Sequence, residues 1–322
     1  MRIGMPLGYA QGFRIAVEEL PRYEKAGLDA VHVPEAYTFD SVSALGYIAA
    51  RTTSLTLTSG ILNVYSRTPA LLAMTAAGLD SMSDGRFVLG LGASGPQVVE
   101  GFHGVPYAAP LTRTREVVEI CRAVWRREAL SYQGSHFTVP LDVQHGGSGL
   151  GKPLKLINHP LRERVPVLLA AMGPKNVALA AELCEAWEPI FWYPEGVETA
   201  FGAALREGAT RRDPALQPLE VVADSHLAVV DDEVELEAAL GHVRAHLALY
   251  VGGMGARGSN FYNDLVVRFG FAEQAAVVQD LFLAGDREAA AAAVPDELVR
   301  GVSLIGTAQE VAARLSAFAR SG

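Results

Sequence analysis

The stretch from Gly85 to Pro96 constrains the fold more than any other part of the sequence. It follows Asp84 in a turn, continues as the apolar run Phe87–Leu91, and ends in a loop rich in glycine. A short apolar run between turn residues predicts a strand covered on both faces, as in a parallel sheet. The loop has no bulky side chains, so its backbone N–H groups can approach a flat or anionic ligand closely.

Gly90, Gly92 and Gly95 match the spacing G-x-G-x-x-G, the fingerprint of dinucleotide-binding Rossmann folds. That fingerprint requires a helix that opens at the last glycine. Here Pro96 and a long polar loop follow, and the next predicted helix begins near Thr112. Three predicted strand–helix units also precede the stretch, whereas a dehydrogenase fingerprint usually lies in the first unit. We therefore favour a loop at the carboxyl end of a barrel strand over a Rossmann site.

Strand-like and helix-like segments alternate along the whole chain of 322 residues. Such alternation predicts an α/β protein, and this length suits one TIM-like (β/α)8 barrel with insertions. No internal repeat is visible, so the strands are predicted from local patterns alone. The eight predicted strands are Ile3–Met5, Ala30–Val33, Leu55–Leu62, Phe87–Leu91, Val167–Ala170, Glu188–Phe191, Leu219–Val230 and Val302–Ile305.

We predict a single barrel domain over residues 1–322 with two insertions. The first insertion, at about 130–164, follows the fourth predicted helix (Thr112–Arg127) and contains a small hairpin at Ser131–Leu141. We expect it to lie over the barrel mouth, where loops after the strands form the active site. The second insertion, at about 252–270, follows the seventh predicted helix (Asp232–Tyr250).

The formal net charge of −9 argues against a general nucleic-acid-binding protein, which would need a basic face. No signal-peptide core and no bilayer-length apolar run are visible, so we expect a cytoplasmic protein with no membrane partner. Cys121 and Cys184 fall on apolar faces of predicted helices and are expected in the core. Zinc spacings, H-E-x-x-H and G-x-S-x-G motifs are lacking, so neither a metal nor a serine nucleophile is expected.

The loop after the fifth predicted strand has the features of a phosphate site. Gly173-Pro174 places a proline in the first turn of a helix, where its missing N–H group has no cost. The next N–H groups have no partner within the helix, the helix dipole favours an anion, and Lys175 adds a positive charge. The alternative is an ordinary capped helix with a lysine on the surface.

Glu35 and Tyr37 lie just beyond the second predicted strand. A carboxyl group there can hydrogen-bond a cofactor or handle a proton, although a solvated loop carboxylate has the same sequence signature. Tyr37, Tyr65 and Arg67 are candidate wall residues. The second insertion offers a candidate clamp for an anionic tail, although a structural loop has the same sequence signature; its residues are Arg257, Asn260, Tyr262 and Arg268. A barrel with a phosphate site, but with no metal or nucleophile, suggests that an organic cofactor performs the chemistry.

Three segments of the sequence carry a family resemblance. They are Thr58-Ser-Gly-Ile-Leu-Asn-Val-Tyr-Ser-Arg-Thr-Pro69, Gly85-Arg-Phe-Val-Leu-Gly-Leu-Gly-Ala-Ser-Gly-Pro-Gln97 and Ala170-Ala-Met-Gly-Pro-Lys-Asn-Val177. These segments resemble the bacterial luciferase-like superfamily, and more closely its branch of coenzyme F420-dependent oxidoreductases. The resemblance covers nearly the whole chain and includes Ala248–Met254 and Gly306-Thr307.

This resemblance implies a TIM-like barrel that binds the deazaflavin F420, or alternatively FMN, at the carboxyl ends of its strands. In the family, the third strand has a bulge with a non-prolyl cis peptide bond under the cofactor ring, which here would join Gly60 and Ile61. Glu35 falls where relatives place a polar residue near the reactive ring, so Glu35 and Tyr37 are the candidate catalytic residues. The expected cofactor-binding residues are Ser59, Gly60, Ile61, Asn63, Gly92, Ala93, Ser94, Gln97, Ala171, Met172, Gly173, Pro174, Lys175 and Asn176.

The resemblance also implies hydride transfer between C5 of the deazaflavin and a small organic substrate. Related methylenetetrahydromethanopterin reductases have an acidic residue late in strand one, where this sequence has approximately Pro6. Their proton donor and substrate are therefore not carried over. Two alternatives are an FMN-dependent monooxygenase of the same superfamily and a cofactor-binding protein without turnover. A homodimer is expected because family members are often dimers.

Overall fold

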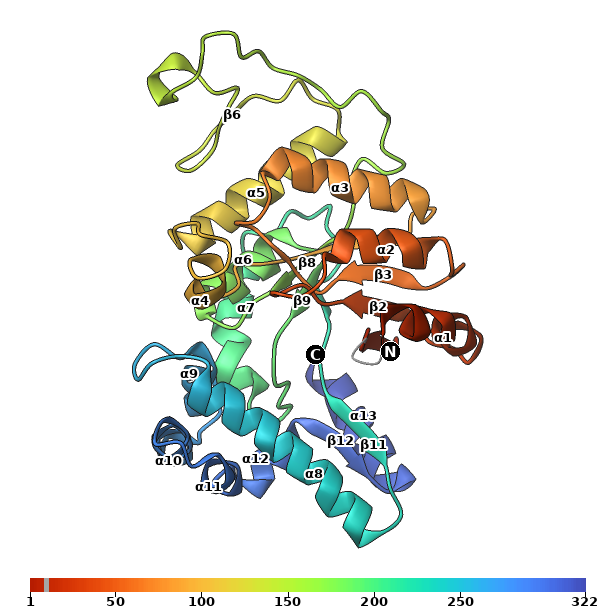
Figure 1. Cartoon of the computed structure of the whole chain (residues 1–322), viewed down its shortest axis with the longest axis vertical. Coiled ribbons are helices and arrows are strands. Elements are labelled where there is room, and N and C mark those ends of the chain that lie inside the picture. The colour runs from red at the N-terminus through yellow and green to blue at the C-terminus, as the bar shows by residue number, and fades with distance from the viewer. Residues whose placement is uncertain (9–11) are drawn as a thin grey trace. The chain divides into compact units, whose positions relative to one another are not determined.

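The computed structural model describes residues 1–8 and 12–322. The chain divides into two compact units, the first made of Met1–Ala170 with Leu183–Ala186 and the second of Ala171–Glu182 with Trp187–Gly322. Both units combine parallel strands with helices (Figure 1). The α/β class that the alternating sequence pattern predicts is therefore confirmed.

A parallel sheet runs through the first unit. Its strands lie side by side in the order β1-β2-β3-β5-β8, and β4 pairs with β5. This order follows the chain, as it does around a TIM barrel, whereas the order in a Rossmann sheet reverses beside its first strand. The Rossmann alternative is therefore wrong. The bounds are β1 (Gly4–Pro6), β2 (Ala30–Val33), β3 (Thr56–Ser59), β4 (Leu62–Asn63), β5 (Phe87–Gly92) and β8 (Val167–Ala170).

Strand β5 lies in the interior, as its apolar sequence predicts. The side chains of Phe87, Leu89 and Leu91 are all 0% exposed. The strand pairs with β3 through Leu57 and Phe87 and with β8 on its other side, so both of its edges are hydrogen-bonded. Since a strand paired on both edges and covered on both faces needs no polar side chains, the continuous apolar run is explained.

Helices α2, α3 and α5 pack in series beside this sheet (Figure 1). Thr68 caps α3 by accepting a hydrogen bond from the N–H of Leu71, and Pro69 occupies the first helical position, as predicted. Cys121 is buried in α5, where burial raises the pKa of its thiol to about 12. Both cysteines are core residues, as expected. The helices are α1 (Phe13–Lys25), α2 (Ser41–Ala49), α3 (Pro69–Met82), α4 (Pro96–Val99) and α5 (Pro110–Trp125).

The segment after the glycine loop differs from the prediction. Pro96 opens the one-turn helix α4, with Gly95 as its N-cap, where a polar loop was expected. Helix α5 begins at Pro110 and not near Thr112. Both helices have proline at their first position, where its fixed φ suits the helix and its missing N–H group has no cost. Four residues are too few to show a helical repeat of apolar positions, so the pattern missed α4.

A small antiparallel hairpin follows α5, as predicted for Ser131–Leu141. Strand β6 (Tyr132–Gln133) pairs with β7 (Thr138–Val139), and a 3-10 turn follows at Val143–His145. The buried carboxylate of Glu116 in α5 accepts hydrogen bonds from the backbone N–H groups of Ser135, His136 and Phe137. One carboxylate thus satisfies three donors at the hairpin turn.

In the second unit, the strands are shorter than predicted. The sixth strand is β9 (Ala186–Glu188), which ends before Pro189, and the predicted range of Glu188–Phe191 is therefore wrong. Proline has no N–H group to donate to a sheet, which explains the early end. The predicted Leu219–Val230 strand is two pieces, β10 (Glu220–Val221) beside β9 and β11 (His226–Val229), which pairs in parallel with β12 (Ser303–Gly306).

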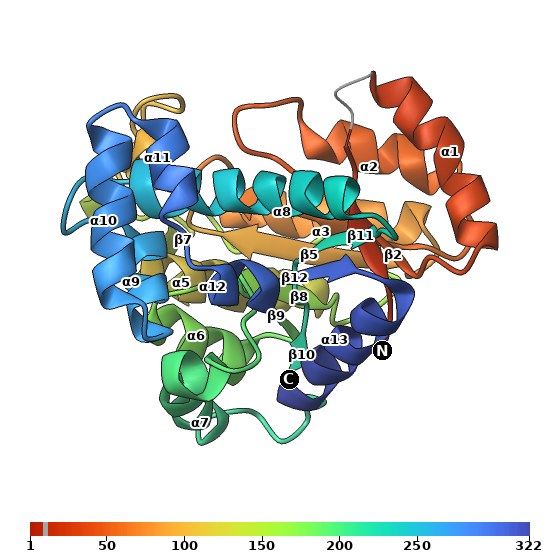
Figure 2. The same ribbon diagram turned by 90° about the horizontal axis from the view of Figure 1, so that it is seen from below.

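The helices of the second unit carry clear capping signals. Asp232 caps α8, and Thr307 with Glu310 forms a capping box at α13. Helices α10 and α11 pack against α8, with α9 beside α10 (Figure 2). The helices are α6 (Pro174–Leu183), α7 (Ala203–Ala209), α8 (Glu233–Ala248), α9 (Phe261–Arg268), α10 (Ala272–Leu283), α11 (Arg287–Ala292), α12 (Asp296–Gly301) and α13 (Ala308–Ser321), with π-helical turns at Glu198–Gly202 and Leu249–Gly253.

Among the described residues, none of the helices combines the length and the apolar character that a membrane crossing demands.

The Glu116 carboxylate is predicted to hold the hairpin turn in place. Glu116→Gln replaces one acceptor oxygen with an NH2 group and removes the charge, at a cost of about 2–4 kcal/mol, since hydrogen bonds to charged groups contribute about 1.5–3 kcal/mol each. We expect the amides of Ser135, His136 and Phe137 to exchange with solvent at least about 30-fold faster. Glu18→Gln, at an exposed position of α1, is the control and should leave their exchange unchanged. Equal exchange in both variants would contradict this account.

Candidate functional site

In the first unit, the ends of β3 and β5 approach each other unusually closely. The hydroxyl of Ser59 donates a hydrogen bond to the carbonyl of Gly90 and accepts one from its N–H group, both at 2.9 Å. A Cβ atom added at Gly90 would lie 1.7 Å from the carbonyl oxygen of Ser59. Glycine is therefore required at position 90 for lack of space.

Beyond this contact, the chain turns through Gly60 and Ile61, whose peptide bond is cis, as the resemblance implied. Strand β4 then places Asn63 opposite Gly92 of β5. The Asn63 side chain is 4% exposed, and its Oδ1 accepts a hydrogen bond from the N–H of Tyr65. Its Nδ2 is buried and has no hydrogen-bond partner in the described part of the chain. A buried donor without a partner has a free-energy cost, so it marks a place where a ligand acceptor would be stabilising.

The glycine loop continues from Gly92 with a backbone suited to close approach. A Cβ atom at Gly92 would lie 2.7 Å from the Ile61 side chain, so the glycine leaves room for that residue. Ser94 has a positive φ of 56°, and its carbonyl accepts a hydrogen bond from the hydroxyl of Tyr107. Ala93 is half-buried, while Gln97 lies exposed in the short helix α4. The structure thus brings the expected residues of β3, β4 and the glycine loop together at the carboxyl ends of these strands.

Glu35 is held by several partners and is not a free loop carboxylate. Arg67 donates to both of its oxygens, at 2.6 and 3.0 Å, and Ser41 at the start of α2 donates its N–H group at 3.0 Å. The Glu35 side chain is only 11% exposed. Two parallel hydrogen bonds from a guanidinium fix the orientation of a carboxylate as well as its charge.

Arg67 also binds Asp40, which extends the ion pair into a network. Its Nη2 lies 2.6 Å from Oδ1 of Asp40, the residue that caps α2. Burial acts to raise the pKa of Asp40, but hydrogen bonds from Ser43 and the Arg67 charge outweigh burial and lower it. The hydrogen bonds and charge of Glu35 raise the pKa of Arg67 against the effect of burial. The network therefore favours the ionised form of Asp40 and fixes the loop after β2.

Tyr37, the second candidate catalytic residue, lies in this loop. Its side chain is 67% exposed, and its ring centroid is 6.3 Å from that of Phe102. The two exposed rings form an aromatic surface in the first unit.

In the second unit, the loop Ala171–Asn176 is fixed from both sides. The N–H of Ala171 donates to the carbonyl of Glu188, and the indole of Trp187 donates to the carbonyl of Ala171 at 2.8 Å. The carbonyl of Gly173 accepts from the N–H groups of Asn176 and Val177. Pro174 is the first residue of α6, as predicted, and both Pro174 and Lys175 are exposed. A Cβ atom at Gly173 would meet nothing within 4 Å, so open space lies beside the backbone there.

Arg268 of α9 also hydrogen-bonds to this loop. Its Nη2 donates to the carbonyl of Met172 at 2.9 Å, and its guanidinium lies 6.0 Å from the Phe201 ring centroid. Its Nε is buried and has no hydrogen-bond partner within the described ranges. Burial lowers the pKa of Arg268 while the Asp264 charge opposes that shift. The sequence singled out Arg268 only as one of two arginines in the 252–270 segment.

Each unit offers donors that suit one part of a flat, phosphorylated cofactor. The first unit offers the unpartnered Asn63 amide beside backbone that lacks side chains, and the second offers Arg268 and the open backbone at Gly173. In the part of the chain that the structure describes, no cluster of three His, Cys, Asp or Glu residues is arranged to hold a metal ion. The donors present are amides and a guanidinium, which suit carbonyl and phosphate oxygens.

Comparison with known proteins gives a consistent result. The model of the family described as "Luciferase-like monooxygenase" matches residues 1–322. A Mycobacterium tuberculosis protein, described as "Putative coenzyme F420-dependent oxidoreductase", is 39% identical over 327 residues, which cover 100% of this chain and 93% of that protein. The 5,10-methylenetetrahydromethanopterin reductase of Archaeoglobus fulgidus is 29% identical over 309 residues, covering 93% of this chain and 84% of that enzyme.

A solved structure with the same fold is the coenzyme F420-dependent tetrahydromethanopterin reductase of Methanopyrus kandleri. Its TM-score is 0.81 at 20% identity, over 100% of this chain and 90% of the reductase. The likeness places the parallel sheet and its helices in the same fold class as that reductase.

Gly90→Ala tests the close contact between β3 and β5. The added methyl group would overlap the Ser59 carbonyl, and because both partners are backbone in paired strands, we expect a loss of at least about 3 kcal/mol of unfolding free energy. Gly78→Ala is the control, since Gly78 is an exposed glycine of α3 with open space around it and alanine favours helix by about 0.5–1 kcal/mol. Thermal unfolding of both variants measures the effect. A Gly90→Ala protein as stable as the control would contradict the geometry.

Proposed function

Because the chain belongs to the luciferase-like monooxygenase family, we propose that this oxidoreductase depends on coenzyme F420 and transfers a hydride between the deazaflavin and a small organic substrate. Similarity to a protein described as F420-dependent over the full length of this chain supports the cofactor. The observation that carries the proposal is the buried, unpartnered Nδ2 of Asn63 beside Gly92. A carbonyl oxygen on a flat ring would supply the acceptor that this donor lacks.

In the first unit, we assign the ring-binding role to the carboxyl ends of β3, β4 and β5. Asn63 donates to the ring system, and the backbone at Gly60, Ile61 and Gly92 gives it a surface without bulky polar groups. The remaining ring-proximal residues that we propose are Ser59, Ala93, Ser94 and Gln97. The hydroxyl of Ser59 is already bound to Gly90, so its role is to hold the two strands together under the ring.

In the second unit, we assign the phosphate-binding role to the loop Ala171–Asn176 with Arg268. Open space beside Gly173 admits an anion to the backbone at the start of α6. Lys175 is exposed and supplies positive charge, while Arg268 donates to the carbonyl of Met172 and supplies further donors. Backbone N–H groups and a helix dipole favour an anion at such a position.

Glu35 and Tyr37 are the proposed residues near the reactive part of the cofactor. The two hydrogen bonds from Arg67 fix the orientation of the Glu35 carboxylate. The proposed role of Glu35 is to orient the loop after β2. In this loop, Tyr37 presents an exposed aromatic ring. When bound, the deazaflavin supplies hydride transfer at its C5 atom, and the protein supplies binding, orientation and proton handling.

An FMN-dependent monooxygenase is the second candidate, because the family description itself names a monooxygenase. Such an enzyme would consume oxygen together with reduced FMN. A protein that binds the cofactor without turnover is the third candidate, and it would show saturable binding but no substrate-dependent oxidation of F420 across a broad panel.

Side-by-side equilibrium titrations with F420, FMN and NADPH test the proposed cofactor. We expect a dissociation constant for F420 at least about tenfold lower than that for FMN, which corresponds to about 1.4 kcal/mol of binding free energy. NADPH should not saturate the protein. Changes in cofactor absorbance or fluorescence provide the readout. Equal or tighter binding of FMN would contradict the proposal and favour the monooxygenase.

A further inference from the structure

Three exposed aromatic side chains lie on the segments that follow β2 and β5 in the first unit. Tyr37 and Phe39 come from the loop after β2 and are 67% and 71% exposed, and Phe102, shortly after α4, is 65% exposed. The rings of Tyr37 and Phe102, here called the aromatic pair, have centroids 6.3 Å apart and planes inclined by 51°. Large apolar side chains that gather at a surface typically mark a binding site.

The aromatic pair bridges the two segments that flank the end of β3. The N–H of Gly60, directly after β3, donates to the carbonyl of Val33 at the end of β2, and β3 pairs with β5 on its other side. The segments after β2 and β5 therefore start on either side of the turn at Gly60. Since Tyr37 comes from one segment and Phe102 from the other, their contact spans the carboxyl end of β3, beside the candidate ring site.

Other contacts fix the segment after β5 against the residues that follow Asn63. The Tyr65 ring stacks on that of Tyr107, with the centroids 5.3 Å apart. The Tyr107 hydroxyl donates to the carbonyl of Ser94 in the glycine loop. The surface that carries Phe102 is thereby connected to the strand end that carries the unpartnered Asn63 amide.

The acidic groups beside the aromatic pair already have partners. Glu35 and Asp40, the two acids of the loop after β2, are both paired with Arg67. Glu100 accepts a hydrogen bond from the N–H of Tyr107 at 3.1 Å. A charged ligand would lose hydration at this surface without gaining a partner of opposite charge, so the surface favours an uncharged, apolar ligand.

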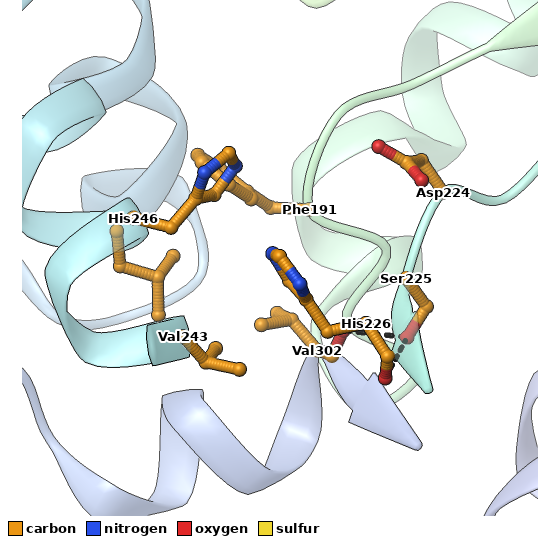
Figure 3. Close-up of a pocket in the computed structure, with 8 residues that line it drawn as sticks. Phe191, Asp224, Ser225, His226, Val243, His246 and Val302 are labelled. Carbon is orange, nitrogen blue, oxygen red and sulfur yellow. Dashed lines mark hydrogen bonds between the residues drawn. The ribbon is translucent and has the colours of Figure 1, made fainter. Parts of the chain in front are cut away.

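A cavity in the second unit is too small for an organic substrate. Phe191, Asp224, His226 and His246 are among its lining residues, and its volume is about 20 Å³ (Figure 3). A cavity of this size holds about one water molecule. Substrate binding is therefore assigned to the open surface of the aromatic pair and not to this cavity.

We propose that Tyr37 and Phe102 bind an aromatic ring of the substrate, which is an uncharged aromatic compound. This substrate class rests on the proposed function. Aromatic rings attract each other in offset-stacked and edge-to-face arrangements, and two exposed rings inclined to each other offer a face and an edge to a third ring. A saturated group of the same size gains burial but lacks this attraction, so the aromatic pair selects for an aromatic ring.

Titrations of the full-length protein with two matched ketones, followed by fluorine NMR, test this proposal without and with saturating oxidised F420. The ketones are 4′-fluoroacetophenone and its saturated counterpart, 4-fluorocyclohexyl methyl ketone. We expect the wild type to bind the aromatic ketone about 3–10-fold more tightly than the saturated one. Tyr37→Leu and Phe102→Leu should each weaken binding of the aromatic ketone alone, whereas Tyr37→Phe should keep the preference. Tyr47→Leu, an exposed ring of α2, is the control and should bind like the wild type.

The results separate this proposal from the proposed cofactor. Equal affinity of the wild type for the two ketones, or a preference that persists in both leucine variants, overturns the aromatic site even where F420 binds. Absence of F420 binding, with the aromatic preference intact in the wild type and lost in the leucine variants, overturns the cofactor and supports the aromatic site.

Sedimentation velocity of the same variants tests whether a second copy of the chain covers the aromatic pair instead. We expect the wild type, Tyr37→Leu and Phe102→Leu to sediment alike. A change of oligomeric state in either leucine variant would assign the two rings to an interface between copies and overturn the proposal. Circular dichroism of each variant verifies that it is folded.

Discussion

The reciprocal hydrogen bonds between the Ser59 hydroxyl and the backbone of Gly90 are the contact on which the candidate ring site depends. They bring β3 and β5 so close that a Cβ atom at position 90 has no room. Beyond this contact, the chain turns into β4 and presents the buried Asn63 amide beside Gly92. A buried donor without a partner is rare in proteins, and an acceptor on a bound ligand would satisfy it.

Two carboxyl groups show how different surroundings separate their properties. Glu35 has a guanidinium on both oxygens and a backbone donor at the start of α2, so its carboxyl group is fixed in orientation within its loop. Glu188 instead has burial and the nearby Asp224 charge, which raise its pKa to about 7.

Local patterns in the sequence predicted much of the framework. The apolar run of β5, the Thr68 cap with Pro69 and the first helical position of Pro174 all follow from neighbours within a few residues. The resemblance to a known family, not periodicity, predicted the cis bond at Gly60–Ile61.

What the sequence could not supply is long-range side-chain geometry. The ion pair of Arg67 with Glu35 spans 32 positions, and the contact of Arg268 with Met172 spans 96. The boundaries of β9 were misjudged because Trp187 and the residues after Pro189 are equally apolar, and only the missing N–H of that proline ends the pairing. Glu188 did leave a signal, since a carboxyl group within the run Trp-Glu-Pro-Ile-Phe is out of place in a buried strand.

The central claim is that main-chain groups and Arg268, with no reactive side chain, hold the phosphate of a deazaflavin. The most direct test is equilibrium binding of F420 and of the same deazaflavin without its phosphate to the wild type, Arg268→Gln and the exposed control Arg257→Gln. We expect the wild type and the control to bind the phosphate-free form about 10–100-fold more weakly, as charge-assisted hydrogen bonds contribute about 1.5–3 kcal/mol. Arg268→Gln should weaken F420 binding and leave binding of the phosphate-free form unchanged. Equal affinity of the wild type for both ligands would contradict the account.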